Sequence, residues 1–324
     1  MKEQLQLHPS MQPQDMVKLC FQAAYGAEHL LGDITRVRQY FDDEMARISE
    51  RDGPLVEFIA DDVCRVNMAV WKKHRLPGEW LFNLFVESAQ ERRGNGKEIF
   101  DAYMKQAEAF MPMGKEWQGI TAPVHHTDIY RENEYPAYRV IAGRYPRVIP
   151  ILACMTPSCV VAIDGRAASG KTTIAHDLAA VTGAGVIHVD DFFLPKALRT
   201  NERLASPGGN FHHERLAEEV LPFLRSGEGF SYRKFDCTSM TYDDNKRNVL
   251  PAPIRVVEGA YSCHPVLGSY MDLRVFSDIA PDAQMQRIEI RNGAMAAMYK
   301  EKWIPMEEAY LQAFSIKRNA DVII

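Results

Sequence analysis

The sequence has few cysteines, no long apolar run and no excess of positive charge. Its six cysteines form no C-x-x-C pair, which argues against a zinc site or a redox dithiol and fits a reducing compartment. The apolar runs are far shorter than the roughly 20 residues that cross a bilayer, and the polar start MKEQLQLHPSMQPQD has no signal core. The net charge of −5 gives no basic surface for nucleic acid. We therefore expect a cytoplasmic protein that binds neither membrane nor nucleic acid.

The chain is long enough for two domains, and its pattern changes near residue 150. Before this point, apolar residues recur mostly at helical spacing. Residues 54–71 instead alternate around an Asp61-Asp62 turn and predict a hairpin, whereas the prolines and glycines of 133–150 predict a linker. We therefore predict a mostly helical α+β accessory domain over 1–150, whose role the sequence does not indicate, and a second domain over 151–324.

After residue 158 the pattern alternates between strands and helices. The predicted strands are CVVAIDG, GVIHVDDFF, IRVVEGAY, DLRVFSDI and ADVII, and the helices between them include 170–183, 213–227 and 281–292. Such alternation predicts an α/β fold with a parallel sheet covered by helices on both faces. Ligands of such sheets bind beyond the carboxyl ends of the strands.

The stretch VVAIDGRAASGKTTIAHDLA contains the pattern G-x-x-x-x-G-K-[ST] between a predicted strand and a predicted helix. Glycines let the loop turn tightly and bring N–H groups to phosphate oxygens, and the helix N-terminus attracts negative charge. Lys171 supplies a cation for the β and γ phosphates, and the Thr172 hydroxyl can ligate Mg²⁺. The predicted ATP-binding residues are Gly165, Arg166, Ala167, Ala168, Ser169, Gly170, Lys171, Thr172 and Thr173.

Carboxylates follow two other predicted strands and so lie at the same sheet edge. Asp190 and Asp191 are adjacent, so their side chains leave an extended backbone in opposite directions and at most one faces the γ phosphate. Such a carboxylate can take a proton from an attacking hydroxyl or orient Mg²⁺. Glu258, at the end of VVEGAY, is a candidate for the magnesium shell, and so is Asp191, together with Thr172. The alternative for each is a carboxylate that caps a turn or faces solvent.

Two arginines lie on one face of the helix predicted over 281–292. Arg287 and Arg291 are four residues apart, and guanidinium groups so placed can close over a phosphoryl group during transfer and balance its charge. The alternative is a solvated helix face. With Lys171 and Asp190, these arginines complete the candidate catalytic set.

The second half resembles the uridine kinase and phosphoribulokinase group of P-loop kinases. GRAASGKTT, VDDFF, PGGNFHHERL, YRKFDC, VVEGAY, RIEIRN and ADVII occur in the order typical of that group. The resemblance implies a P-loop NTPase fold, Asp190 as the catalytic carboxylate and a mobile lid around 287–305. It also implies ATP with Mg²⁺ as the donor and a small-molecule hydroxyl as the acceptor.

The segments that read the nucleoside in uridine kinases differ here. His212 stands where that group has an acidic residue for the ribose, and Cys237 replaces the second aromatic around Phe235 and Asp236. His212, Phe235 and Asp236 remain the candidates for acceptor binding. Because a pocket without its polar partners loses discrimination, we expect uridine to be a poor acceptor. Another nucleoside, a sugar derivative or a cofactor precursor stays open.

The sequence leaves a second function open. A nucleotide-dependent switch or ATPase, with residues 1–150 as its output, uses the same P-loop but only water as acceptor. The residues between 190 and 291 favour the kinase. The sequence does not decide between ATP and GTP as donor, nor whether the chain forms a homo-oligomer. His125, His126 and Asp128 have no metal-ligand spacing, and we expect them to be structural.

Overall fold

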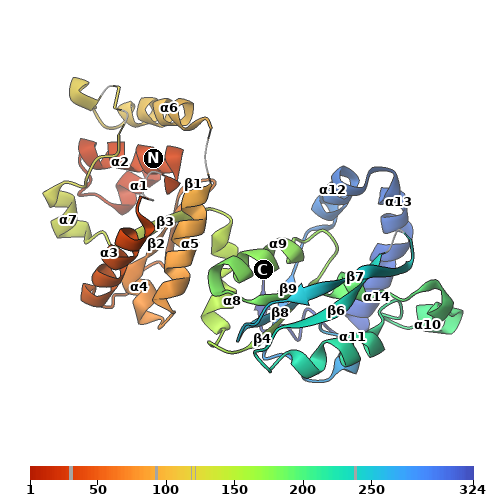
Figure 1. Cartoon of the computed structure of the whole chain (residues 1–324). Helices are drawn as coiled ribbons and strands as arrows, with labels where there is room; N and C mark the ends of the chain where they lie inside the picture. The colour runs from red at the N-terminus through yellow and green to blue at the C-terminus, as the bar shows by residue number, and fades with distance from the viewer. Residues whose placement is uncertain (29–31, 92–93, 118, 121, 237–238) are drawn as a thin grey trace. The chain divides into compact units, whose positions relative to one another are not determined.

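The computed structural model describes residues 1–324 with the exception of 29–31, 92–93, 118, 121 and 237–238 (Figure 1). The chain divides into two compact units, Met1–Pro146 and Arg147–Ile324. Each unit has its own sheet and its own hydrophobic core. Among the described residues, every helix is too short or too polar to cross a lipid bilayer.

The first unit combines helices with a three-stranded antiparallel sheet in the order β1-β2-β3. The predicted hairpin is confirmed, because β1 (Val56–Ala60) pairs with β2 (Val63–Asn67). The linker prediction was wrong over β3 (Tyr138–Ala142), which pairs with β2 and buries Val140 and Ile141. The helices are α1 (Lys2–Leu7), α2 (Pro13–Tyr25), α3 (Ile34–Arg47), α4 (Met68–Lys73), α5 (Gly78–Gln90), α6 (Gly96–Glu108) and α7 (Asp128–Glu134).

The second unit is built on a five-stranded parallel sheet in the order β10-β9-β4-β8-β5. Its strands are β4 (Val160–Gly165), β5 (Gly185–His188), β8 (Arg255–Glu258), β9 (Leu273–Ser277) and β10 (Val322–Ile323). Each lies within a predicted strand, and all residues of β4 and β8 are buried, as expected of strands covered on both faces. The predicted α/β fold of a P-loop NTPase is therefore confirmed.

The helices of the second unit pack around this sheet (Figure 1). They are α8 (Ile149–Cys154), α9 (Lys171–Thr182), α10 (Asn201–Ala205), α11 (His213–Glu219), α12 (Pro281–Asn292), α13 (Ala296–Met298) and α14 (Ile304–Ala313), with a π-helix over Tyr299–Trp303. Helix α9 packs against β4, β5 and β8. Residues of α11 and α14 join a core with Ile187, Val257 and Phe276 of the sheet.

Two features of this unit differ from the sequence expectations. Strand β5 ends at His188, and a 3-10 turn over Val189–Phe192 replaces the rest of the predicted strand. A separate antiparallel hairpin of β6 (Phe230–Asp236) and β7 (Thr241–Val249) stands apart from the parallel sheet. The 3-10 turn matters for the site, because it carries both Asp190 and Asp191.

Candidate active site

The loop between β4 and α9 has the backbone shape that its sequence predicts. Gly165 has a φ of 135°, and a Cβ there would lie 2.1 Å from the carbonyl oxygen of Ser277 in β9. Gly170 caps the N-terminus of α9 with a φ of 100°, and Ala168 has a φ of 60°. Positive φ values strain L residues, so glycine is required at the two ends of the loop. The loop therefore leads a buried strand directly into the N-terminus of a helix, the place where phosphate binds.

Lys171 lies over this loop, at the start of α9. Its Nζ donates hydrogen bonds to the carbonyl oxygens of Gly165 at 2.8 Å and Arg166 at 2.9 Å. The ammonium is thus held beside the backbone N–H groups rather than in bulk solvent. This arrangement puts a cation and peptide donors together, the combination that binds polyphosphate.

Thr172 and Glu258 meet because β4, which leads through the P-loop into α9, is the neighbour of β8. The register of β4 and β8 pairs Ile163 with Glu258, so the end of β8 lies beside the P-loop. The Thr172 hydroxyl donates to the Glu258 carboxylate at 3.1 Å, and Nδ1 of His188 lies 2.5 Å from the same carboxylate. A hydroxyl and a carboxylate side by side are hard oxygen ligands of the kind that Mg²⁺ prefers. These two residues therefore fit the predicted metal site, whereas its third candidate, Asp191, is paired with Arg247 and does not line the cleft.

Asp190 and Asp191 diverge at the 3-10 turn. The Asp190 side chain is exposed and lines the cleft described below. Poor hydration among the cleft walls raises the pKa of Asp190, and the nearby negative charge of Glu258 raises it further, while Lys171 lowers it. Asp191 is buried and bound to Arg247 at 2.6 Å, and it also accepts a hydrogen bond from the Tyr232 hydroxyl at 3.2 Å. The structure thus brings Asp190 to the cleft and does not bring Asp191 there.

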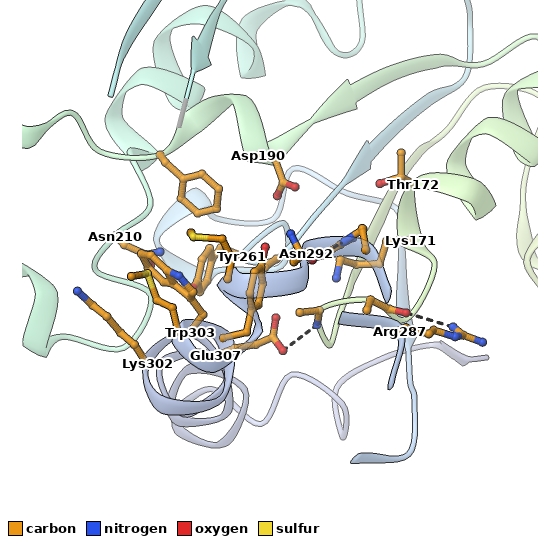
Figure 2. A pocket seen from close by; sticks show the side chains of 18 of the residues that line it. Lys171, Thr172, Asp190, Asn210, Tyr261, Arg287, Asn292, Lys302, Trp303 and Glu307 are labelled. Atoms are coloured by element: carbon orange, nitrogen blue, oxygen red, sulfur yellow. Dashed lines mark hydrogen bonds between the residues drawn. The ribbon is translucent and has the colours of Figure 1, made fainter. Parts of the chain in front are cut away.

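A cleft of about 780 Å³ joins the P-loop to Asp190 (Figure 2). Its volume suits a nucleotide together with a small acceptor. The predicted residues in its lining come from the P-loop, the strand ends and α12: Ala167, Ala168, Gly170, Lys171, Thr172, Thr173, Asp190, Glu258, Arg287 and Arg291. Gly165, Arg166 and Ser169 shape the loop without lining the cleft. The Arg166 guanidinium instead binds Glu308 at 2.6 Å and also contacts Asp278.

The segment from Arg287 to Glu307 forms one wall of the cleft. Arg287 donates from Nη1 to the carbonyl oxygen of Ala168 at 3.1 Å, which fixes α12 to the P-loop (Figure 2). After α12 the wall continues through α13 and the π-helix to α14. The sequence resemblance implies a lid here, and the segment lines the cleft from Arg287, which is bound to Ala168 of the P-loop, to Trp303 and Glu307. Its additional lining residues are Asn292, Met295, Met298, Tyr299, Lys302, Trp303 and Glu307.

The three candidates for acceptor binding do not line the cleft. His212 uses Nδ1 to accept a hydrogen bond from the Arg215 N–H at 3.1 Å, so its side chain caps α11. Phe235 is buried and packs against Tyr242, and Asp236 accepts a long hydrogen bond from the Ser239 N–H at 3.4 Å. Cys237 lies outside the described residues. The acceptor end of the cleft is therefore not built from these candidates.

Other residues line that end, and sequence reasoning missed them: Phe193, Arg199, Asn210, Met240, Ala260 and Tyr261. Asn210 is 2% exposed, and its Oδ1 has no hydrogen-bond partner among the described residues. A buried amide oxygen without a partner is costly unless a ligand supplies a donor. The motif PGGNFHHERL contains this asparagine, but only its place in the fold distinguishes it from the histidines that follow.

In the first unit, His126 is part of a buried polar network, whereas His125 is exposed. His126 binds Asp15 through Nδ1 at 2.9 Å and the Tyr138 hydroxyl through Nε2 at 2.6 Å. Asp15 also accepts hydrogen bonds from the N–H and hydroxyl of Thr127. In the described parts of the chain, no group of three His, Cys, Asp or Glu side chains could hold a metal ion. The network therefore has the satisfied hydrogen bonds of a structural core.

Known structures similar to this chain include several kinases, whereas no protein-family model matches it. A protein described as a possible uridine kinase from Bacillus stearothermophilus is 23% identical, with a TM-score of 0.41 over 54% of this chain and 93% of the other. One described as a fructose transport system kinase from Silicibacter sp. is 20% identical, with a TM-score of 0.44 over 54% and 95%. D-glycerate 3-kinase from Cryptococcus neoformans var. grubii is 16% identical, with a TM-score of 0.36 over 48% and 79%.

Proposed function

We propose that this chain transfers the terminal phosphoryl group of ATP to a hydroxyl group of a small molecule. The observation that carries the proposal is that Lys171, other P-loop residues and Asp190 all line the same cleft. The P-loop accounts for the donor. A carboxylate that opens into the same cleft, and that no cation neutralises by direct contact among the described residues, accounts for activation of the acceptor.

The Thr172 hydroxyl and the Glu258 carboxylate would hold Mg²⁺. Their oxygens already lie at hydrogen-bond distance from each other, next to the loop that would bind the phosphates. When bound, the ion supplies positive charge that neutralises the phosphate oxygens. His188 contacts the same carboxylate from β5 and so fixes its orientation.

Three cations of the chain surround the place of phosphoryl transfer. Lys171 starts α9, and Arg287 and Arg291 reach the cleft from α12. Preorganised positive charge in a cleft that excludes bulk water stabilises the charge that spreads over the phosphoryl oxygens during transfer. Arg287 donates a hydrogen bond to the Ala168 carbonyl oxygen. Arg291 donates to the side chain of the adjacent Asn292 and also lines the cleft.

Asp190 would accept the proton of the acceptor hydroxyl. A base whose pKa is raised toward neutrality takes a proton more effectively than an ordinary carboxylate. The unpaired Oδ1 of Asn210 can accept a hydrogen bond from a second polar group of the acceptor, and Phe193, Met240 and Trp303 offer apolar contact. These features suit a hydroxyl-bearing metabolite such as a nucleoside, a sugar derivative or a cofactor precursor.

The experiment is a screen of the purified chain with γ-labelled ATP and Mg²⁺ against hydroxyl-bearing compounds of those three classes. We expect label to appear in one acceptor in preference to inorganic phosphate. Release of inorganic phosphate at an equal rate with every compound would contradict the kinase and favour the nucleotide-dependent ATPase. GTP in place of ATP, with the best acceptor, identifies the donor.

A further inference from the structure

A carboxylate of the chain itself occupies one of the anion-binding donors of the P-loop. Oε1 of Glu307, in α14, accepts a hydrogen bond from the backbone N–H of Ala167 at 2.8 Å, and the side chain lines the cleft beside Lys171 (Figure 2). Glu307 is 5% exposed, so solvent does not compete for this contact. Successive N–H groups of such loops bind anions such as phosphate. Glu307 thus takes a place suited to a phosphate oxygen.

The surroundings of Glu307 bring the pKa of its carboxyl group close to neutral pH. Burial is the main cause that raises the pKa of Glu307 to about 7, while Lys171 and the Ala167 N–H lower it. Asp164 in β4 and the adjacent Glu308 raise it further by repulsion, and the Tyr261 ring lies nearby. The group is therefore a carboxylate above about pH 7 and a neutral acid below it.

We propose that Glu307 competes with a phosphate group of the donor nucleotide for the Ala167 N–H, so that nucleotide binding displaces Glu307 from the P-loop. This inference rests on nucleotide binding as proposed above. One N–H cannot serve two anions at full strength, and a carboxylate beside a phosphate repels it strongly where water is excluded.

Displacement of Glu307 would act on the acceptor end of the cleft. Trp303 precedes Glu307 by four residues and lies one helical turn away, and Lys302 is next to it; both line the cleft. The neighbouring Glu308 remains bound to Arg166, so the far side of α14 keeps its anchor. Release of Glu307 therefore frees the start of α14 without detaching the helix. The acceptor wall takes its final form only after the nucleotide is bound.

The test compares ATP affinity of the wild-type chain and Glu307→Gln between pH 6 and pH 8.5, with Mg²⁺ present. Glutamine keeps an oxygen for the Ala167 N–H but removes the charge. We expect wild-type affinity to fall relative to the variant as pH rises through about 7. At pH 8.5 the variant should bind ATP at least about tenfold more tightly than the wild-type chain does.

Glu301→Gln is the matched control, since it removes an exposed negative charge of the same segment outside the cleft lining and should leave ATP affinity unchanged. Glu307→Ala replaces the glutamine variant if that variant does not fold, as judged by circular dichroism. Equal ATP affinity and parallel pH profiles for wild type and Glu307→Gln would overturn the inference while leaving nucleotide binding intact. A wild-type chain that binds no ATP at any pH would remove the proposed function as well.

Discussion

Asp190 and Asp191 are adjacent in the chain and yet occupy opposite electrostatic environments. Asp190 opens into the cleft near Glu258, whereas Asp191 is buried and ion-paired with Arg247. A 3-10 turn at the end of β5 causes the divergence, because it rotates successive side chains away from each other. The two carboxylates should therefore fail in different ways when each is neutralised.

Asp190→Asn should lower kcat by roughly 10²–10⁴-fold, because a general base typically contributes that much. ATP affinity should change little. Asp191→Asn should instead lower the melting temperature, since it leaves the buried side of Arg247 without its counter-charge. Steady-state kinetics with the best acceptor, ATP titration and thermal melting of both variants test this, with the exposed Asp101→Asn as control. A larger kcat loss in a folded Asp191→Asn would exchange the two assignments.

Lys171→Ala should abolish tight ATP binding and turnover while leaving the fold intact. The side chain is half-buried and donates hydrogen bonds to two carbonyl oxygens of the loop, so its removal takes away a cation without opening a core. Titration with ATP and a circular dichroism spectrum check both parts of the expectation. Lys196→Ala, at an exposed position of the same unit, should bind ATP normally. Unchanged ATP affinity in Lys171→Ala would contradict the P-loop assignment.

Asn210→Ala should raise the KM for the acceptor and leave ATP affinity unchanged. The reason is the buried Oδ1, which lacks a partner among the described residues and belongs to a side chain in the cleft lining. The loss of one hydrogen bond to a neutral group corresponds to roughly 0.5–1.5 kcal/mol, which is about a two- to tenfold change. Asn201→Ala, exposed at the start of α10, is the control. An unchanged KM in a folded Asn210→Ala would place the acceptor elsewhere.

Uridine should be a poor acceptor. Nδ1 of His212 accepts the hydrogen bond that caps α11, and Phe235 is buried against Tyr242. Neither side chain is therefore available to bind a nucleoside. Comparison of kcat/KM for uridine, cytidine, sugars and cofactor precursors decides the matter. If uridine or cytidine ranks first, the interpretation of the acceptor end is wrong.

Acid should destabilise the first unit through His126. Burial lowers the pKa of His126 to about 4, so the folded chain keeps the ring neutral while the unfolded chain protonates it below about pH 6.5. Since the unfolded state then binds more protons, stability falls as pH drops from about 6.5 toward 4. His126→Gln should therefore lose less melting temperature than wild type between pH 7.5 and 4.5. The exposed His125→Gln should follow wild type, and a parallel decline in all three would refute the role of His126.

The sequence alone determined the parts of the site that depend on local geometry. A strand, a glycine-bounded loop and a helix N-terminus follow one another within a short stretch, so the P-loop could be placed from spacing and turn chemistry. The alternation of strands and helices likewise predicted the parallel sheet. The local pattern failed where the partner is remote, because the residues of β3 form a strand by pairing with the distant β2.

Only the tertiary structure decided which remote residues meet at the cleft. Glu258 lies beside Thr172 because of the register between β4 and β8, and the turn after β5 separates Asp190 from Asp191. Asn210 and Glu307 carry no motif of their own, since an isolated asparagine or glutamate is usually a surface residue. Packing of distant segments buries both side chains and removes their water. It leaves Oδ1 of Asn210 without a partner among the described residues and places Oε1 of Glu307 on the Ala167 N–H. Their chemistry comes from this desolvation, which the order of residues does not encode locally.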